Sequence, residues 1–323
     1  MAPTSASVLT PRQRFAEDVR RDLDRPQKRL QPQYLYDALG SQLFEAICEL
    51  PEYRITRAER GLLAANAGEM SAGLASPVTL VELGGGSGEK LALLIEPLVR
   101  SLRDVSVDLV DVSATAIALA TRTLGRFPAL PVTGHEATYE DGLGEAVAKR
   151  SGDDTILVAF LGSNIGNLDP AEARAFLGRV RSALRASDRL VLGADLVKPE
   201  ADLVLAYDDP LGVTAAFNKN LLGRINRELG ANFDLDQFAH RAVWNASASR
   251  VEMHLESLCD QSVSLPGANC QVLFAEGESI WTESSYKYNE DGIAEMGAAA
   301  GFARRDQWVD GEARFAVTAF DAV

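Results

Sequence analysis

Residues 78–90 read Val-Thr-Leu-Val-Glu-Leu-Gly-Gly-Gly-Ser-Gly-Glu-Lys. An apolar run rich in β-branched residues ends in an acid, Glu82, and breaks into a glycine-rich segment. This pattern predicts a buried parallel strand that turns tightly into a helix. Because glycine has no Cβ, the backbone of such a turn can lie directly against a nucleoside.

A second apolar segment, residues 105–110, ends in Asp111. In nucleotide-binding βαβ units, an acid at this place accepts hydrogen bonds from both hydroxyls of a ribose. The two segments together favour a nucleotide site over the carboxyl ends of neighbouring strands.

The glycine spacing discriminates between nucleotides. The dinucleotide fingerprint requires a third glycine where this chain has Glu89, and the phosphate-binding P-loop fails because Leu91 follows Lys90. The pattern present, with glycines at 84, 86 and 88, resembles the first motif of class I methyltransferases, whose cofactor is S-adenosylmethionine. Another nucleotide binder and a purely structural turn remain open on the glycines alone.

Strands and helices alternate from about residue 58 to residue 197. Asp169, Pro170 and Glu172 form the start signal of one helix, with a capping box, and Ser113 is a candidate N-cap for another. The predicted fold class is α/β, with a mostly parallel, doubly wound, Rossmann-like sheet. The predicted strands are 79–83, 105–110, 131–133, 155–161 and 189–196; the predicted helices include 91–102 and 113–125; and a loop is expected at 135–141.

The pattern changes after Pro199. A helical segment, 212–229, is followed by β-like segments at 251–259 and 271–275. We expect residues 200–287 to be an insertion that forms a substrate-binding lobe with residues 1–57. Residues 58–199 plus 288–323 then form the cofactor-binding domain, with the last segment returning to the sheet as a helix and antiparallel strands.

Composition limits the partners. The chain has 323 residues and a net charge of −14, which disfavours nucleic acid and anionic membranes, since both reward clustered Lys and Arg. No segment resembles a signal peptide or a membrane span. The three cysteines and three histidines lack metal-ligand spacing, so no metal is expected. We therefore expect a cytoplasmic protein and, by default, a monomer.

Four groups of residues are candidates for substrate binding. Asn167 follows the fourth strand and offers both a donor and an acceptor, which suits an amino acid's carboxylate or amine. Tyr207 begins the inserted lobe. If residues 282–287 are extended, Glu283 and Ser285 point to one side and suit the two nitrogens of an imidazole. The aromatic residues before the first strand, with Tyr36, Phe44 and Tyr53 among them, suggest a pocket wall. Turn formation, ordinary packing and a surface strand are the competing explanations.

These groups, in this order, resemble the histidine-specific N-alpha-methyltransferases of ergothioneine biosynthesis. The resemblance runs from about Arg20 to the C-terminus. Its most specific segments are 50–53 with Thr56 and Arg57, then 160–168, 194–198, 207–218, 226–229, 232–235, 252–253 and 282–287.

The resemblance implies a role for each candidate. On the cofactor side, Gly84, Gly86, Lys90 and Gly162 would contact S-adenosylmethionine, and Asp111 its ribose. Family members carry an Asp-Phe pair at the adenine, where this chain has Thr138 and Tyr139. On the substrate side the implied residues are Tyr36, Phe44, Tyr53, Asn167, Tyr207, Met253, Glu283 and Ser285.

Among the substrate residues, Asn167 and Tyr207 would hold the carboxylate, with Tyr53 nearby, and Asn167 and Tyr36 would orient the amine. Met253, Glu283 and Ser285 would meet the ring, with Phe44 lining the pocket. The implied reaction is trimethylation of the α-amine of L-histidine to hercynine, with no residue certain to act as a base. The alternatives are methylation of another amino acid, such as tryptophan, and a non-catalytic S-adenosylmethionine-binding protein.

Overall fold

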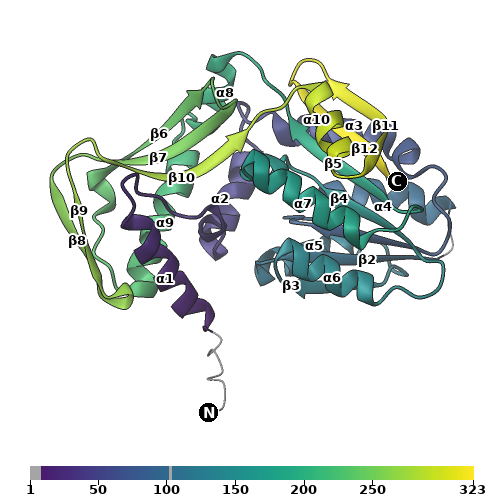
Figure 1. The fold of residues 1–323 in the computed structure, drawn as a ribbon, viewed down its shortest axis with the longest axis horizontal. Coiled ribbons are helices and arrows are strands. Elements are labelled where there is room, and N and C mark those ends of the chain that lie inside the picture. The colour runs from purple at the N-terminus through teal and green to yellow at the C-terminus, as the bar shows by residue number, and fades with distance from the viewer. Residues whose placement is uncertain (1–8, 102–103) are drawn as a thin grey trace, which may run out of the picture. The chain divides into compact units, whose positions relative to one another are not determined.

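The computed structural model describes residues 9–101 and 104–323, and its helices and strands are drawn in Figure 1. The chain divides into two compact units. The first unit comprises Met1–Phe44, Tyr207–Val243 and Glu252–Glu283, and the second comprises Glu45–Ala206, Trp244–Val251 and Ser284–Val323. The predicted helix end at residue 102, and residues 1–8 of the predicted lobe, lie outside the described residues.

The second unit contains a seven-stranded sheet with the order β11-β12-β5-β4-β1-β2-β3. β12 is antiparallel to both of its neighbours, and the other pairs are parallel. The mostly parallel α/β sheet is therefore confirmed, and so is the return of the last segment to it. The strands are β1 (Val78–Leu83), β2 (Val105–Asp111), β3 (Val132–Glu136), β4 (Thr155–Phe160), β5 (Arg189–Asp195), β11 (Phe302–Asp310) and β12 (Phe315–Ala322).

Helices cover both faces of this sheet, as Figure 1 shows. α3 packs on α4, and α4 on α5, over one face, while α7 packs on α6 and α10 over the other. The apolar residues on one face of α7, from Ala173 to Val180, are buried in the core between helices and sheet, together with Leu184 just after the helix. The helices are α3 (Ile55–Ser71), α4 (Glu89–Ser101), α5 (Ala114–Leu124), α6 (Tyr139–Ala148), α7 (Pro170–Ala183), α8 (Glu200–Tyr207) and α10 (Glu290–Ala299).

Local capping signals account for several helix starts. The Ser113 hydroxyl accepts the N–H of Ala116 at the start of α5. Asp169 and Glu172 form a capping box at α7, with Pro170 at its first position. Both predictions are confirmed, and each cap satisfies N–H groups that a helix leaves unpaired at its first turn.

The predicted loop at 135–141 is wrong. His135 and Glu136 belong to β3, and α6 begins at Tyr139. The cause is a second N-cap: the Thr138 hydroxyl accepts the N–H of Asp141 at 3.3 Å and donates to the Asp141 carboxylate at 2.9 Å. This pairing starts a helix where the sequence interpretation placed a loop.

The first unit contains helices and antiparallel strands. Its interior includes an aromatic group in which Phe238 packs edge-on against Phe274 at 5.4 Å and against Phe233 at 5.7 Å. β8 pairs with β9, and β6, β7 and β10 form a sheet in the order β10-β7-β6; the last three strands have residues in both units. The elements are α1 (Pro11–Leu23), α2 (Ala38–Cys48), α9 (Val213–Leu229), β6 (Phe238–Asn245), β7 (Arg250–Ser257), β8 (Gln261–Leu265), β9 (Cys270–Phe274) and β10 (Ser279–Tyr286), with short 3₁₀ turns at Pro32–Leu35, Asn164–Asn167, Leu235–Gln237 and Pro266–Ala268.

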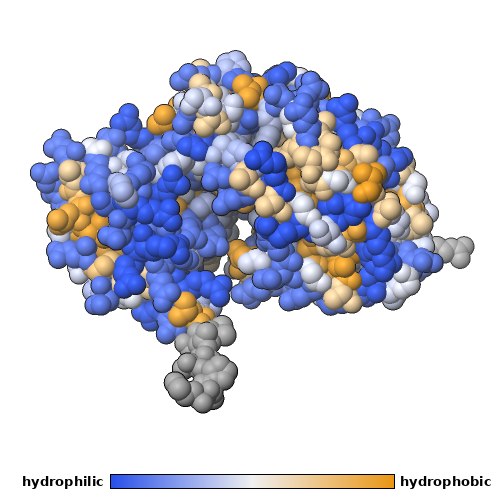
Figure 2. Space-filling model, viewed as in Figure 1, coloured by the Kyte–Doolittle hydropathy of each residue, from blue (hydrophilic) through white to orange (hydrophobic). Residues whose placement is uncertain are grey.

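The surface is mainly polar where it can be seen. Figure 2 shows hydrophobic residues in small patches among hydrophilic ones. Over residues 9–101 and 104–323, no helix has the length and apolar character needed to cross a membrane.

Candidate active site

The glycine-rich loop joins β1 to α4 and depends on residues without a Cβ. Gly84, Gly86 and Gly88 have φ values of 72°, 56° and 75°, a region that other residues rarely adopt. A Cβ at Gly84 would lie 2.7 Å from the Tyr139 hydroxyl, and one at Gly88 would lie 3.0 Å from the backbone of Ala120. The loop therefore forms a cradle that side chains on these glycines would fill.

Glu82 lies beneath this cradle and is 1% exposed. Neither of its carboxylate oxygens has a hydrogen-bond partner among the described residues, and burial raises the pKa of Glu82 to about 8. A Cβ on Gly85 would lie 1.9 Å from Glu82 Oε2, so the carboxyl group touches the loop. A buried carboxylate without a partner is costly unless a cationic or donor group meets it, which fits the ammonium and sulfonium groups of S-adenosylmethionine.

Glu59, on α3, joins two of the predicted cofactor residues. The Lys90 ammonium donates to Glu59 Oε2 at 2.7 Å, and the N–H of Gly162 donates to both carboxylate oxygens at 2.8 and 2.9 Å. Burial opposes the charge on Lys90, but Glu59 outweighs it and raises the pKa of the ammonium. Gly193 leaves room for the acid, because a Cβ there would lie 1.9 Å from Glu59 Oε1.

Asp111 and Tyr139 are two further residues predicted to contact the cofactor. Asp111 ends β2, its Oδ1 accepts the N–H of Ser113 at 2.8 Å, and burial raises its pKa. The Tyr139 ring packs edge-on against Phe160 at 5.3 Å and Phe176 at 6.0 Å. The structure thus brings Tyr139 to the glycine loop, whereas Thr138 caps α6.

Asn167 ends a 3₁₀ turn that is fastened from two sides. The turn follows Ser163, which has a φ of 59° and whose Oγ accepts the N–H of Asp195 at 2.9 Å. The Tyr288 hydroxyl donates to the carbonyl of Ile165 at 3.1 Å. A Cβ on Gly166 would lie 2.7 Å from the carbonyl of Tyr286, so the turn packs against the end of β10, next to Ser285.

Ser285 belongs to a buried network of charged side chains. The Lys287 ammonium donates to Ser285 Oγ at 2.9 Å and lies 2.9 Å from Asp195 Oδ2. Lys198 donates to the other oxygen of Asp195 at 2.6 Å. The side chains of Lys287 and Asp195 are 0% and 2% exposed, so their charges are satisfied inside the protein.

The remaining predicted residue of the second unit is Tyr53, which is buried. Its N–H donates to the carbonyl of Leu50 at 3.2 Å. The Arg57 guanidinium donates to the carbonyls of Leu50 and Pro51 at 2.8 and 2.6 Å. Arg57 therefore fixes the turn that carries Tyr53.

In the first unit, Tyr36 and Phe44 meet a third ring. Tyr36 lies 5.5 Å from both Phe44 and Phe217, in edge-on geometry, and Phe44 lies 6.0 Å from Phe217. The structure brings the two predicted residues together and adds Phe217 from α9.

Tyr207, also in the first unit, is held through its backbone. His240 Nε2 donates to the carbonyl of Tyr207 at 2.8 Å, and the Asn218 amide donates to His240 Nδ1 at 2.9 Å. This arrangement requires a neutral imidazole, and burial lowers the pKa of His240.

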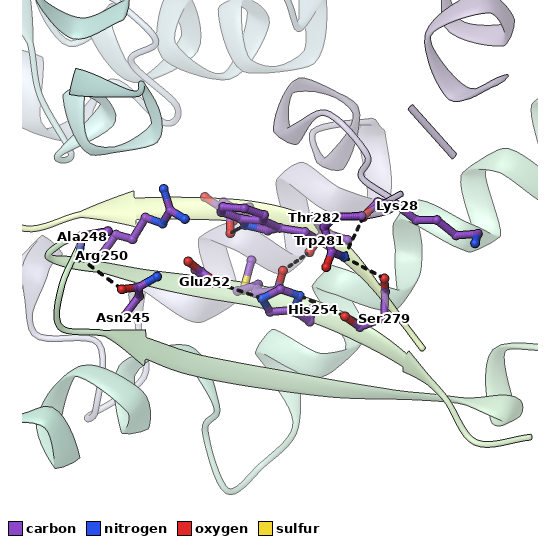
Figure 3. Close-up of polar contacts among 12 residues, drawn as sticks. Lys28, Asn245, Ala248, Arg250, Glu252, His254, Ser279, Trp281 and Thr282 are labelled. Carbon is purple, nitrogen blue, oxygen red and sulfur yellow. Dashed lines mark hydrogen bonds and ion pairs between the residues drawn. The ribbon is translucent and has the colours of Figure 1, made fainter. Parts of the chain in front are cut away.

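β7 and β10 carry Met253 and Glu283. The Thr282 hydroxyl donates to the carbonyl of Met253 at 3.0 Å, and Trp281 Nε1 donates to the carbonyl of Glu283 at 2.9 Å. Figure 3 shows His254 between Glu252 and Ser279, beside the Trp281 ring, which it stacks on at 5.8 Å. Met253 and Glu283 are almost completely buried.

Residues 15–322 match the model of one protein family, described as histidine-specific, S-adenosylmethionine-dependent methyltransferases. The chain belongs to this family. A histidine N-alpha-methyltransferase from Mycolicibacterium smegmatis is 40% identical over 91% of this chain and 90% of its own. One from Mycobacterium tuberculosis is 41% identical over the same shares. Ergothioneine biosynthesis protein 1 from Neurospora crassa is 28% identical over 86% of this chain and 31% of its own length.

For this histidine-specific methyltransferase, sequence interpretation missed the residues that hold the site from behind. Glu59 and His240 were given no role in the site, and Asn218 and Lys287 appeared only as the ends of motifs. Glu59 lies on a helix whose acids look alike in the sequence, and its partners are Lys90 and Gly162. A partner that distant leaves no local signal.

Proposed function

We propose that this histidine-specific methyltransferase methylates the α-amine of L-histidine three times with S-adenosylmethionine, giving hercynine in the first step of ergothioneine biosynthesis. The observation that carries the proposal is the family match over residues 15–322. The relatives named histidine N-alpha-methyltransferase support methylation of the α-amino nitrogen of histidine.

The second unit supplies the residues proposed for the cofactor. When bound, S-adenosylmethionine provides a methyl group on a sulfonium that is already electrophilic. In the proposal, Gly84 and Gly86 allow close backbone approach to the cofactor, the Glu82 carboxyl becomes negatively charged by losing its proton when the cofactor binds, and Asp111 accepts hydrogen bonds from the ribose hydroxyls. Lys90 and Gly162 both donate to Glu59, and Lys90 follows the glycine-rich loop at the start of α4. Thr138 and Tyr139 remain our assignment for the adenine end.

The substrate residues act by orientation. In the proposal, Asn167 and Tyr207 hold the carboxylate with Tyr53 nearby, while Tyr36 and Asn167 orient the amine. Met253, Glu283 and Ser285 receive the imidazole ring, and Phe44 lines the wall. Positioning a neutral amine in line with an activated methyl group lowers the barrier mainly through proximity and exclusion of water. Ring faces such as that of Tyr36 tolerate the growing cation.

The same proposal extends to the organisation of the protein. Residues 58–199 plus 288–323 form the cofactor-binding domain, and residues 1–57 plus 200–287 form the substrate lobe. We expect a cytoplasmic monomer that acts on a small molecule, without nucleic acid or membrane partners.

Mass spectrometry tests the function directly. The protein is incubated with S-adenosylmethionine and an equimolar pool of the twenty amino acids. We expect histidine alone to be converted, ending as a trimethylated product. Conversion of another amino acid would overturn the assignment of the ring residues, and cofactor binding without any methyl transfer would contradict an enzymatic function.

Glu283→Ala tests the ring assignment. Removing the carboxylate should lower kcat/KM for histidine by more than tenfold, because a charge-assisted hydrogen bond to the ring is lost, while cofactor affinity changes little. Titration calorimetry and steady-state kinetics measure the two quantities. Equal losses would contradict the role.

A double variant tests the pocket wall. Glu283→Ala with Met253→Val enlarges and neutralises the ring pocket, so turnover of tryptophan should rise relative to histidine. Unchanged selectivity would mean that these residues do not form the ring pocket.

A further inference from the structure

Glu45 is an acid at a helix end that disfavours one. It lies in the last turn of α2 and belongs to the second unit. The C-terminus of a helix is the negative end of its dipole, so a carboxylate there is destabilising. Glu49, four residues on, adds a like charge at the spacing at which side chains repel. The helix itself therefore gives no reason for an acid at this position.

The Glu45 carboxylate lies against the glycine-rich loop. A Cβ on Gly86 would lie only 3.2 Å from Glu45 Oε1, and the backbone of Gly86 has a φ of 56°. The loop thus approaches the acid at a position where it carries no side chain.

No cation of the protein pairs with Glu45. Burial raises its pKa, Lys90 lowers it, and Glu49 raises it further. The Lys90 ammonium, however, is held by Glu59 at 2.7 Å. Over residues 9–101 and 104–323, the Glu45 carboxylate has no hydrogen bond or ion pair. An acid that is partly buried against a loop, without a counter-charge, favours a cationic ligand at that loop.

We propose that Glu45 is a further cofactor-binding residue, which accepts hydrogen bonds from the ammonium group of S-adenosylmethionine. The inference rests on the cofactor of the proposed function and on none of its substrate residues. An ammonium carries three donors and no acceptor, so it pairs with a carboxylate whose acceptors are not filled. Hydrogen bonds between two charged groups are shorter and stronger than neutral ones.

The two cationic groups of the cofactor differ in what they require. A sulfonium has no N–H to donate, so a negative charge nearby is enough for it. An ammonium requires hydrogen-bond acceptors, and it binds at least cost where it keeps part of its hydration. Glu45 is partly exposed, whereas both carboxylate oxygens of Glu82 are buried beneath the loop. Glu45 therefore suits the ammonium better than Glu82 does.

Binding of two ligands without a sulfonium tests the inference. S-Adenosylhomocysteine keeps the ammonium, and its deamino analogue has hydrogen in place of the ammonium and is otherwise identical. Titration calorimetry at neutral pH, in the absence of amino acid, gives the dissociation constant of each. In the wild type the deamino analogue should bind about tenfold more weakly or worse, because a charge-assisted hydrogen bond is lost.

Glu45→Gln removes the charge and keeps the length of the side chain. It should weaken binding of S-adenosylhomocysteine by about tenfold or more and leave binding of the deamino analogue within about twofold of the wild type. Glu45→Ala removes the acceptor as well, and should give the same pattern with at least as large a loss. Glu49→Gln is the matched control, because Glu49 is an exposed acid at the same helix end; it should leave the preference for S-adenosylhomocysteine unchanged.

The outcomes separate this inference from the proposed function. A wild type that does not bind S-adenosylhomocysteine would refute the cofactor site itself. If the wild type binds it, equal losses for both ligands in Glu45→Gln, or no loss for either, would refute the role of Glu45. A loss for S-adenosylmethionine with normal binding of S-adenosylhomocysteine would place Glu45 at the sulfonium, and would also refute the inference.

Discussion

Glu59 contacts two of the residues proposed to bind the cofactor. It is 0% exposed, and it binds both the Lys90 ammonium and the Gly162 N–H. Removing one member of a buried ion pair leaves an uncompensated charge, which costs several kcal/mol. The acid therefore supports both the stability of the second unit and the shape of its cofactor loop.

Glu59→Gln should weaken cofactor binding by tenfold or more and lower the free energy of unfolding by about 3 kcal/mol. Calorimetry with S-adenosylmethionine and urea unfolding measure the two effects. Glu69→Gln on the same helix is the control, because the Glu69 side chain is exposed and, among the described residues, accepts a side-chain hydrogen bond only from the Trp308 indole N–H, at 3.3 Å; it should change stability by no more than about 0.5 kcal/mol. A folded Glu59→Gln protein with full cofactor affinity would contradict this role.

The Glu82 carboxyl should couple cofactor binding to pH. Its pKa is raised to about 8, so below this pH it is protonated and must lose a proton to meet a cationic ligand. Affinity should therefore rise with pH toward 8, by up to about tenfold per unit. The amino group of the cofactor titrates in the same range, so the measured quantity is the difference in slope between wild type and Glu82→Gln.

Glu89→Gln is the control for Glu82, since Glu89 begins α4 at the other end of the glycine-rich loop, with its side chain 48% exposed. It should retain the wild-type slope. Identical slopes in wild type and Glu82→Gln would show that Glu82 does not meet the ligand. Without cofactor, the free energy of unfolding depends on pH in the opposite direction. Glu82 keeps its proton in the folded state but releases it in the unfolded state above about pH 4.5, so stability falls as the pH rises from there toward 8.

At the level of elements, the β1–loop–α4 unit carries most of the information that the sequence contains. The apolar run, the glycines and the helix that follows are local patterns, and β1 and α4 lie where these patterns predict. Position 138 shows the limit. A threonine before Tyr-Glu-Asp is compatible with both a loop and an N-cap, and the 2.9 Å bond to Asp141 is what distinguishes them.

Gly84→Ala tests the glycine loop. The backbone at Gly84 has a φ of 72°, which costs other residues about 1–2 kcal/mol, and the new Cβ would collide with the Tyr139 hydroxyl. Cofactor affinity should drop by more than tenfold in a binding titration. Gly178→Ala, inside α7 with open space around it, should instead stabilise the protein by about 0.5–1 kcal/mol. Similar effects from the two substitutions would contradict a specific role for Gly84.

At the scale of the molecule, the mostly parallel character of the sheet follows from the alternation of strands and helices. The residues behind the site do not, because His240 and Tyr207 meet across a long separation in the chain. A sequence pattern indicates where strands and helices alternate, but it does not indicate which distant polar groups share a hydrogen bond. Lys287 and Asp195 are a second example of such a pair.

His240 should make the free energy of unfolding decrease at acid pH. Its pKa is lowered by burial, so below about 6.5 the unfolded chain binds a proton that the folded protein resists. Stability is therefore full above that pH and is lost as the pH falls. His240→Gln keeps a donor for the Tyr207 carbonyl and should give a smaller loss between pH 7.5 and 5 in urea midpoints. An equal loss in both proteins would place the acid sensitivity elsewhere.

The position of β12 has a consequence for biosynthesis. This strand follows the other six strands of its sheet in the sequence, yet it lies between β5 and β11, so an edge of each neighbour stays unpaired until residues 315–322 have emerged from the ribosome. Unpaired strand edges favour association between chains. The nascent protein should therefore need protection by chaperones until residues 315–322 have been translated, and a variant that lacks these residues should aggregate.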